Sequence, residues 1–425
     1  MPPADPPAPD HPADRAHRRR DLRIIGLIGM GHFLSHFYML SLPPLFLVWR
    51  QEFDVSYATL GLAVALMSGT TALLQTPVGF LVDRHGARPF LVGGTLLMAL
   101  SIAAMAFAPS FWVILPLAIL SGIGNSVIHP ADYAILAGSV SKSFMGRAFA
   151  LHTFTGNVGF ALGPVVMGLL LEAAGLSWRT ALLLVGLLGV PVVVAILLQS
   201  RVLRDQAKPA KGAAASEELS GRALLLSRPM LLFFGFFLLS AMAGAGIQSW
   251  LVPVLGKLWG MPILAASAAL TGYTVGATAG TLVGGWMADA MKRGLLGAVV
   301  GLTIAAMVLL LIPGLVRLPE VLVVALVFLG GLALGTSRTP RDVMLRDASP
   351  RGQIGKVFGF VSSGLPLGSA ITPVPLGLLI DMGYPWLVLP VVAALLGLSL
   401  LCAGGAQGAS AVGRRRAAPQ PQPAE

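Results

Sequence analysis

His32 and His36 stand four residues apart inside a long apolar segment. Side chains at that spacing share one face of a helix. Counting about 1.5 Å per residue from the start of the segment at residue 22, His32 lies roughly 15 Å along it, near the middle of a membrane-spanning helix. Imidazoles ionise near neutral pH, donate to anionic solutes and relay protons. The pair predicts a site for solute binding or proton coupling, with hydrogen bonding to neighbouring helices as the structural alternative.

The spacing of these two histidines is also that of two metal ligands on one helix. The glutamate that a zinc protease carries between its histidines is absent here, because Phe33, Leu34 and Ser35 fill the gap. The sequence also lacks a Ser/His/Asp set at a usable spacing. We therefore expect no metal site, no cofactor and no enzyme activity.

His129 and Asp132 are three residues apart in another apolar segment, so their side chains can hydrogen-bond or share a proton. Pro130 between them removes a backbone donor and bends the helix. We expect a coupling site or part of an inner gate at this place. The competing interpretation is an ion pair at the helix end with Lys142 or Arg147.

Four further polar residues could contact a solute. His152 is expected mainly as a buried histidine with its hydrogen bonds satisfied, and secondarily as a coupling residue. The planar guanidinium of Arg338 suits carboxylate and phosphonate oxygens. Arg338 also lies about 28 Å along a helix that begins near residue 319, from where it could reach the inner surface. Gln248 offers a neutral hydrogen-bond donor, and Trp250 offers either a stacking face or a contact at the membrane interface.

The composition identifies the elements that must position these side chains. Of the 425 residues, 56% are hydrophobic and 11% are charged, against about 25% charged in soluble domains. At about 20 residues per membrane-spanning helix, the apolar residues fill on the order of twelve spans. A single cysteine, Cys402, excludes a disulfide scaffold. The net charge of +11 lies in short breaks between apolar segments, so it indicates a lipid bilayer as partner and not a nucleic acid.

The apolar segments predict an all-α membrane protein with twelve transmembrane helices in two six-helix repeats. The segments cover 22–49, 56–81, 89–108, 111–137, 146–171, 179–199, 229–256, 263–287, 295–315, 318–340, 354–380 and 385–405. The domains that we expect are a disordered cytoplasmic tail at 1–21, a six-helix bundle at 22–199, a cytoplasmic linker at 200–228, a second bundle at 229–405 and a disordered cytoplasmic tail at 406–425.

The basic residues predict the orientation of these helices. If the N-terminus is cytoplasmic, the outer side carries only four of the 29 lysines and arginines, namely Arg50, Arg179, Lys257 and Arg317. The other 25 then fall on the cytoplasmic side, as they do in membrane proteins generally. We expect a multi-pass protein of the cell (inner) membrane with both termini in the cytoplasm.

The two halves of the chain repeat one another. Asp83 and Asp289 end similar strings, 206 residues apart, and Glu172 and Asp381 are 209 residues apart. Prolines recur at nearly the same interval in the pairs Pro44 and Pro253, Pro130 and Pro340, and Pro164 and Pro373. A duplicated six-helix unit is typical of secondary transporters, which alternate access around a central site.

The string Gly79-Phe-Leu-Val-Asp-Arg-His-Gly-Ala-Arg88 resembles the cytoplasmic loop motif of the major facilitator superfamily, and 285–293 looks like a degenerate second copy. The string 159–164 resembles part of the Gly-Pro motif of that superfamily's drug antiporters. Residues 125–130 and 156–159 are similar to fosmidomycin-resistance-type efflux proteins. The resemblance to the superfamily extends over all twelve helices. It implies that helices one, four, seven and ten line a central cavity.

The loop motif has a physical interpretation as a conformational latch. A glycine at 79 allows close approach of two helices and Gly86 allows a tight turn, while Asp83 can pair with a basic residue or a helix N-terminus. The residues that we assign to the latch and to the gate beside it are Gly79, Asp83, Arg84, Gly86, Arg88, Asp289, Arg341 and Asp342. The simpler alternative is a positively charged loop that only fixes the topology.

One position departs from the resembled family. The proton-antiport motif of the superfamily places an arginine on helix four, where this chain has Ala118. Proton coupling, if present, must therefore use another residue.

These features predict a secondary active transporter that works by alternating access. The cavity has histidines and arginines and few carboxylates, which favours a neutral or anionic organic solute over a cation. The resemblance implies export as the direction, and we expect efflux driven by the proton gradient or by the gradient of the solute itself. The alternatives are uptake of an organic acid or other metabolite and, less favoured, a non-transport membrane receptor or enzyme. The partners we expect are a small-molecule substrate, protons and the bilayer, with the protein as a monomer.

Overall fold

The computed structural model describes residues 12–141, 145–203, 226–291, 294–349, 357 and 360–417. The elements within these ranges are all helical, and twelve stretches are long and apolar enough to cross a membrane. The predicted all-α fold with twelve transmembrane helices is confirmed.

The first six spans form the N-terminal bundle. Its elements are α1 (Pro12–Ser41), η1 (Pro43–Leu45), α2 (Phe46–Phe53), α3 (Tyr57–His85), α4 (Ala87–Met105), α5 (Phe111–Ser126), α6 (Ile128–Ser139), α7 (Met145–Gly168), η3 (Leu169–Ala173), α8 (Trp178–Leu187), α9 (Gly189–Gln199) and η4 (Ser200–Val202). Several spans consist of two helical pieces in succession, such as α5 with α6.

The last six spans form the C-terminal bundle. Its elements are α11 (Arg228–Trp259), α12 (Ile263–Ala290), α13 (Leu295–Leu315), α14 (Glu320–Ala348), α16 (Gly364–Ile371), α17 (Pro373–Asp381), η5 (Pro385–Leu387) and α18 (Val388–Ala417).

The described parts of the two predicted tails are helical. Helix α1 already begins at Pro12 and α18 continues to Ala417, so both membrane helices extend past their apolar segments. The arginine-rich ends of these helices are polar, and hydropathy alone does not include them. The remainder of both tails and most of the predicted linker, 204–225, lie outside the described residues.

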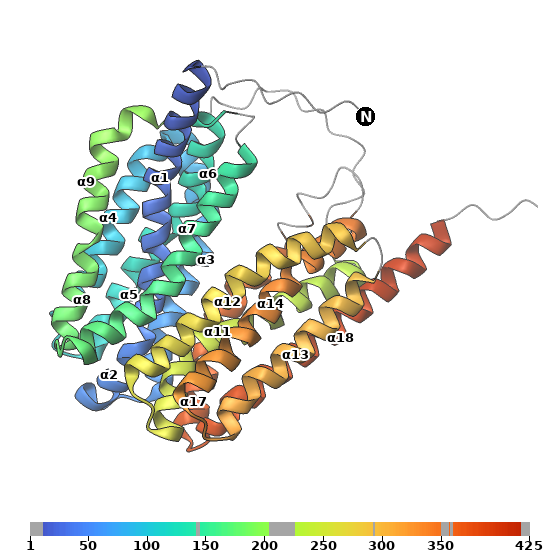
Figure 1. Ribbon diagram of the computed structural model, residues 1–425. Helices are drawn as coiled ribbons and strands as arrows, with labels where there is room; N and C mark the ends of the chain where they lie inside the picture. Colours follow the sequence, from blue (N-terminus) through green and yellow to red (C-terminus); the bar gives the residue numbers. More distant parts are fainter. Residues whose placement is uncertain are drawn as a thin grey trace, which may run out of the picture.

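The two bundles lean against each other at one end of the molecule and diverge toward the other (Figure 1). They meet near α2 and α17, which we call the closed end. They separate toward the start of α1, which we call the open end. The backbones of the two bundles therefore lie closer together at the closed end than at the open end.

Glycines let pairs of helices pack backbone against backbone. On α12, a Cβ at Gly276, Gly280 or Gly284 would lie only 2.1–2.3 Å from a carbonyl oxygen of α14. On α7, a Cβ at Gly159 would lie 2.2 Å from the carbonyl oxygen of Phe33 on α1. Small residues at such spacing are the usual means of close helix packing in membranes.

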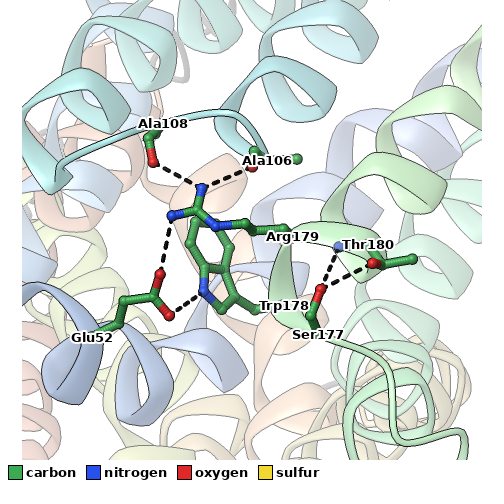
Figure 2. A network of polar contacts seen from close by, with 7 residues as sticks. All are labelled: Glu52, Ala106, Ala108, Ser177, Trp178, Arg179 and Thr180. Atoms are coloured by element: carbon green, nitrogen blue, oxygen red, sulfur yellow. Dashed lines mark hydrogen bonds and ion pairs between the residues drawn. The ribbon is translucent and has the colours of Figure 1, made fainter.

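A polar network fixes the closed end of the N-terminal bundle (Figure 2). The Arg179 guanidinium donates to the carbonyls of Ala106 and Ala108 at 3.0 and 2.9 Å and to the Glu52 carboxylate at 3.0 Å. The indole of Trp178 donates to the other oxygen of Glu52 at 2.8 Å. These contacts join α2, α8 and the connection between α4 and α5, so this end of the bundle is held together by more than apolar packing.

Candidate functional site

Four of the predicted histidines form one cluster inside the N-terminal bundle, which we call the imidazole cluster: His32, His36, His129 and His152. The His32 ring stacks on that of His152 with centroids 3.9 Å apart, and lies 4.5 Å from His36 and 5.0 Å from His129. Helix α1 contributes two of these rings, α6 one and α7 one. The sequence predicted each residue separately, and the fold brings them together.

A glycine of α7 makes room for the two histidines of α1. A Cβ at Gly156 would lie 2.5 Å from Cε1 of His32 and 2.6 Å from Nδ1 of His36. Any larger side chain would collide with one ring or the other. The cluster therefore depends on the close approach of α1 and α7.

A break in the fourth span places the third histidine. Helix α5 ends at Ser126 and α6 begins at Ile128, so the span is interrupted just before His129. Pro130 falls in the first turn of α6, where a missing backbone N–H costs nothing. The interruption of the helix lies at Val127, three residues before this proline.

The ring nitrogens of the cluster are poorly satisfied. Nδ1 of His32 donates to the backbone carbonyl of His152 at 2.8 Å. Among the described residues, no hydrogen-bond partner is found for Nε2 of His32, Nδ1 of His36, Nδ1 of His129 or either nitrogen of His152. The prediction that His152 is a satisfied buried histidine is wrong. Buried polar atoms without partners are costly, so a set of them points to a function.

Asp132 lies at the edge of the imidazole cluster and is completely buried. Its carboxylate is 3.7 Å from Nε2 of His152, beyond hydrogen-bond distance, and neither oxygen has a hydrogen-bond partner in the described part of the chain. The predicted pairing with His129 is therefore not formed. The alternative, an ion pair at the helix end with Lys142 or Arg147, stays a prediction, because Lys142 lies outside the described residues.

A cavity of about 360 Å³ lies between the two bundles. Most of its lining belongs to α11 and α14, with Met39 and Phe160 contributed by the N-terminal bundle. The polar residues of the lining are Ser240, Gln248, Tyr273, Thr303, Ser337, Arg338, Arg341 and Ser369. The predicted solute contacts Gln248 and Arg338 are both among them.

Two arginines give this cavity its charge. The Arg341 guanidinium pairs with Asp342 at 3.0 Å and lies 3.9 Å from the centre of the Phe237 ring. Arg338 forms no ion pair with any carboxylate that the structure describes. Arg341, which the sequence predicts as a gate residue, lines the cavity, and its neighbour Asp342 partly neutralises it. Arg338 keeps its charge available for a solute.

The cavity and the imidazole cluster are adjacent. Phe160 lines the cavity and stacks on the His36 ring with centroids 4.0 Å apart. Met39, one turn beyond His36 on α1, also lines the cavity. A single aromatic ring therefore lies between part of the cluster and the solute space.

Trp250 has neither of its predicted roles. Its side chain is fully buried, and its indole N–H donates to the carbonyl of Pro373 at 2.9 Å. It packs against Phe46 and Tyr57 of the opposite bundle. Trp250 is thus a packing residue at the closed end and contacts neither the cavity nor the membrane interface.

The predicted latch is only partly visible. Gly86 has a φ of 89° and joins α3 to α4, so it supplies the expected tight turn. A Cβ at Gly79 would meet nothing within 4 Å, so the expected close approach is absent from this conformation. Arg84 is exposed, and Nε of Arg88 is buried without a partner in the described residues. The side chains of Asp83 and Asp289 lie outside the described set.

Two carboxylates at the closed end connect the bundles. Asp381 accepts hydrogen bonds from the backbone nitrogens of Tyr57 and Ala58 at 2.7 and 2.8 Å, at the start of α3. Glu172 accepts from those of Ile263 and Leu264 at 2.5 and 2.8 Å, at the start of α12. Sequence reasoning paired these acids as repeats and assigned them no role. Their equal spacing at helix ends was the available signal.

Comparisons with known proteins agree with this architecture. The family model described as Major Facilitator Superfamily matches residues 28–258 and 238–423. The chain is 26% identical over 378 residues to a fosmidomycin resistance protein of Escherichia coli, which covers 87% of this chain and 89% of that protein. It is 24% identical over 411 residues to the membrane sensor protein UhpC of Salmonella typhimurium, with 92% of each covered.

A solved structure shows the same fold. A bacterial homologue of the human lysosomal transporter Spinster, in an inward-facing and occupied conformation, superposes with a TM-score of 0.75 at 15% identity. The match covers 96% of this chain and 99% of that one.

Proposed function

Because the chain belongs to the Major Facilitator Superfamily of membrane transporters, we propose that it exports a small anionic or neutral organic solute in exchange for protons. The chain is a multi-pass membrane protein and not an enzyme. The proposal concerns the solute, the coupling and the direction.

The charge of the cavity supports an anionic solute. Arg338 is a lining residue without a carboxylate partner in the described chain, and no Asp or Glu is among the residues that line this cavity. An organic cation would meet uncompensated positive charge there. A carboxylate or phosphonate would receive bidentate hydrogen bonds from the guanidinium. This arginine is the single observation that carries the proposal.

Asp132 is the proposed proton carrier. It is a buried carboxylate inside the membrane, and such groups are costly unless they have a function. The titratable side chains near it are His152 on α7, His32 and His36 on α1, and His129 and Tyr133 on α6. Helix α5, from Phe111 to Ser126, contains no titratable residue. Ala118 stands where the superfamily's antiport motif has an arginine, so a separate proton site is required.

The direction of transport is proposed from the relatives. One of them is named for resistance to fosmidomycin, which is a phosphonate and thus fits the proposed solute class. Export is the direction that resistance needs. Uptake of an organic acid is the second candidate, because the same arginine would bind it. The relative named as a membrane sensor makes a receptor the third candidate.

We propose that the closed end faces the outside of the cell, which gives the structure a place in an alternating-access cycle. The distribution of basic residues supports cytoplasmic termini, and with that orientation the open end faces inward and the solute enters the cavity from the cytoplasm. Closure of this end and opening of the other would release it outside. We propose that the protein performs this cycle as a monomer in the inner membrane.

Transport by the purified protein in proteoliposomes tests the proposal. Fosmidomycin and a set of carboxylates, neutral sugars and organic cations would be offered on the cytoplasmic side, with and without an imposed pH gradient. We expect movement of anionic solutes, accelerated when the trans side is acidic. Preferential movement of cations, or insensitivity to the pH gradient, would overturn the solute class or the coupling.

A further inference from the structure

We propose that His32, His36 and His129 form a binding site for a divalent ion of the late first-row transition metals, of which Zn²⁺ is the representative. One nitrogen atom of each ring can be chosen so that all three lie within 4.8 Å of one another. The proposal concerns binding by the N-terminal bundle alone and does not depend on the identity of the transported solute.

The donor set selects the class of ion. Imidazole nitrogen is a ligand that suits zinc, copper, nickel and iron, whereas Mg²⁺ and Ca²⁺ require oxygen ligands. Three histidines with one free position form a familiar zinc arrangement. The glutamate that sequence reasoning required is needed only for hydrolytic chemistry and has no part in holding an ion. The third ligand comes from α6, which the spacing of two histidines on α1 does not predict.

Orphaned nitrogens inside the cluster point to a missing ligand. Nε2 of His32, Nδ1 of His36 and Nδ1 of His129 are buried and have no hydrogen-bond partner among the described residues. His32 itself is only 3% exposed. A metal ion placed between the rings would satisfy lone pairs that are otherwise buried at a cost.

An outer-shell hydrogen bond already orients one ligand. Because Nδ1 of His32 donates to the carbonyl of His152 at 2.8 Å, its proton is on Nδ1 and the lone pair is on Nε2. Metal-binding histidines nearly always donate their second N–H in this way, which fixes the ring and raises its basicity. A histidine that only packs against its neighbours does not need a hydrogen bond that fixes the orientation of its ring.

The surroundings also supply counter-charge. A dication with three neutral imidazoles needs negative charge nearby in a region of low dielectric constant. The Asp132 carboxylate is fully buried and lies 3.7 Å from His152, whose ring stacks directly on His32. This carboxylate is the acid that the structure places beside the cluster.

The geometry requires only a small contraction. Zinc–nitrogen bonds of about 2.0–2.1 Å in a tetrahedron separate the nitrogens by about 3.4 Å, so each pair must close by at most about 1.4 Å. Rotation of the rings is sufficient for such a change. Gly156 carries no Cβ, so no side chain from this position of α7 stands against the two rings of α1.

Direct binding to the full-length protein tests the proposal. The protein would be purified in detergent through an affinity tag that contains no histidine, stripped with a chelator, and titrated with Zn²⁺ against a chromophoric competitor. Co²⁺ would serve as a second probe, because its visible spectrum is intense in tetrahedral sites and weak in octahedral ones. We expect one ion per chain and an intense Co²⁺ spectrum.

Three substitutions make the test specific. His36→Gln and His129→Gln should each weaken Zn²⁺ binding by at least the roughly 10–100-fold that loss of an outer-shell partner causes. His85→Gln is the matched control, since that histidine is exposed at the end of α3. Its binding should equal that of the native chain. Thermal unfolding and size-exclusion profiles of each variant would verify that it is folded.

The result that would overturn the proposal is clear. If folded His36→Gln and His129→Gln bind Zn²⁺ as tightly as the native protein, or if Co²⁺ gives only a weak octahedral spectrum, the cluster is not a metal site. Failure of the transport proposal has a different signature, because the binding measurement involves neither solute nor proton gradient.

Discussion

Asp381 and Glu172 occupy equivalent positions in the two halves of the chain, 209 residues apart, and each binds the first two backbone N–H groups of a helix in the opposite bundle. The first N–H groups of a helix have no partner within the helix and carry its positive dipole end. A carboxylate is therefore a strong ligand for them. The closed end is held by this pair of symmetric contacts.

Glycines make the same contacts possible. A Cβ at Gly377 would lie 2.6 Å from the carbonyl oxygen of Tyr57, and a Cβ at Gly168 would lie 3.0 Å from Cα of Leu264. These two glycines are also 209 residues apart. Each carboxylate thus stands one turn beyond a glycine that brings its helix against the opposite bundle. Both parts of this closure come from the duplicated unit.

The first prediction concerns Asp381→Asn. An amide keeps the shape but loses the charge and can accept with only one oxygen, so one charge-assisted pair of hydrogen bonds is weakened by about 1.5–3 kcal/mol. We expect the closed end to open in a larger fraction of molecules, by about tenfold or more. Spin labels on cysteines at positions 54 and 382, in a Cys402→Ser background, would report the distance between the bundles.

The equivalent substitution in the other half of the chain is the comparison for Asp381→Asn. Glu172→Gln should produce a similar shift, and the double variant a larger one. If the distance distribution of Asp381→Asn equals that of the unmodified protein, the contact is not a determinant of closure.

The second prediction concerns Arg338, the unpaired arginine of the cavity. Arg338→Gln removes the charge but keeps hydrogen-bonding capacity, and the loss of a charged hydrogen bond costs about 1.5–3 kcal/mol. We expect KM for an anionic solute to rise by roughly 10–100-fold. Arg338→Lys should recover part of the affinity, because lysine keeps the charge without the planar fork.

Arg317→Gln is the matched control for the cavity. This arginine lies in the connection between α13 and α14, away from the residues that line the cavity. Its removal changes the net charge equally, and KM should stay unchanged. An equal increase in both variants would mean that the overall charge, and not the cavity, determines affinity.

The sequence predicted the helices well and the contacts between them poorly. Apolar segments and repeated prolines fix where each span begins and ends, because the bilayer demands a certain length. Ionisable residues inside spans are rare, so the four histidines could be selected directly. Their partners depend on how each helix is rotated, and Gly156 and Gly159 set that rotation through contacts with α1. The proximity of Asp132 on α6 to His152 on α7, at 3.7 Å, is one such contact between helices that the sequence does not indicate.

The direction of a side chain is likewise hard to predict from the sequence. Trp250 was assigned to solute or to the membrane interface, because tryptophan is common in both places. In the fold it is enclosed at the closed end by residues of the other half, such as Tyr57. The depth of Arg341 along α14 predicts a gate residue, and its direction in the fold also makes it part of the cavity lining. Depth can be read from a sequence, but direction requires the packed structure.

The third prediction tests the glycine packing of the C-terminal bundle. Gly280→Ala would place a Cβ 2.2 Å from the carbonyl oxygen of Leu332 and 2.7 Å from the nitrogen of Thr336, so α12 and α14 must separate. We expect a loss of about 1–3 kcal/mol in stability from overpacking, seen as a lower Tm in detergent.

Gly285→Ala provides the comparison on the same helix. Its Cβ would meet nothing within 4 Å. Replacement of a helical glycine by alanine at an open position gains up to about 1 kcal/mol of helix propensity, so Tm should be equal or higher. Equal destabilisation of both variants would show that the close contact at Gly280 is unimportant.

The fourth prediction concerns Asp132→Asn, which removes the proposed proton carrier without changing its volume. The side chain is buried and isosteric replacement leaves the packing of α6 intact, so the variant should fold and insert. We expect solute exchange across the membrane without a pH gradient to persist, because the cavity arginine is unchanged. Acceleration by the gradient should disappear. The measurement is the ratio of transport rates with and without an imposed pH difference in proteoliposomes.

A structural role for Asp132 would give a different pattern. If the carboxylate only stabilises the position of His152, both exchange and gradient-driven transport should fall together in Asp132→Asn, and the ratio of the two rates should stay at its native value. Asp347→Asn supplies the reference for removal of one acid, because Asp347 is half exposed at the end of α14 and pairs only with its neighbour Arg346 among the residues described. A lower ratio in Asp132→Asn than in this reference is the outcome that assigns the proton to Asp132, since only a carrier affects the coupling more than the exchange.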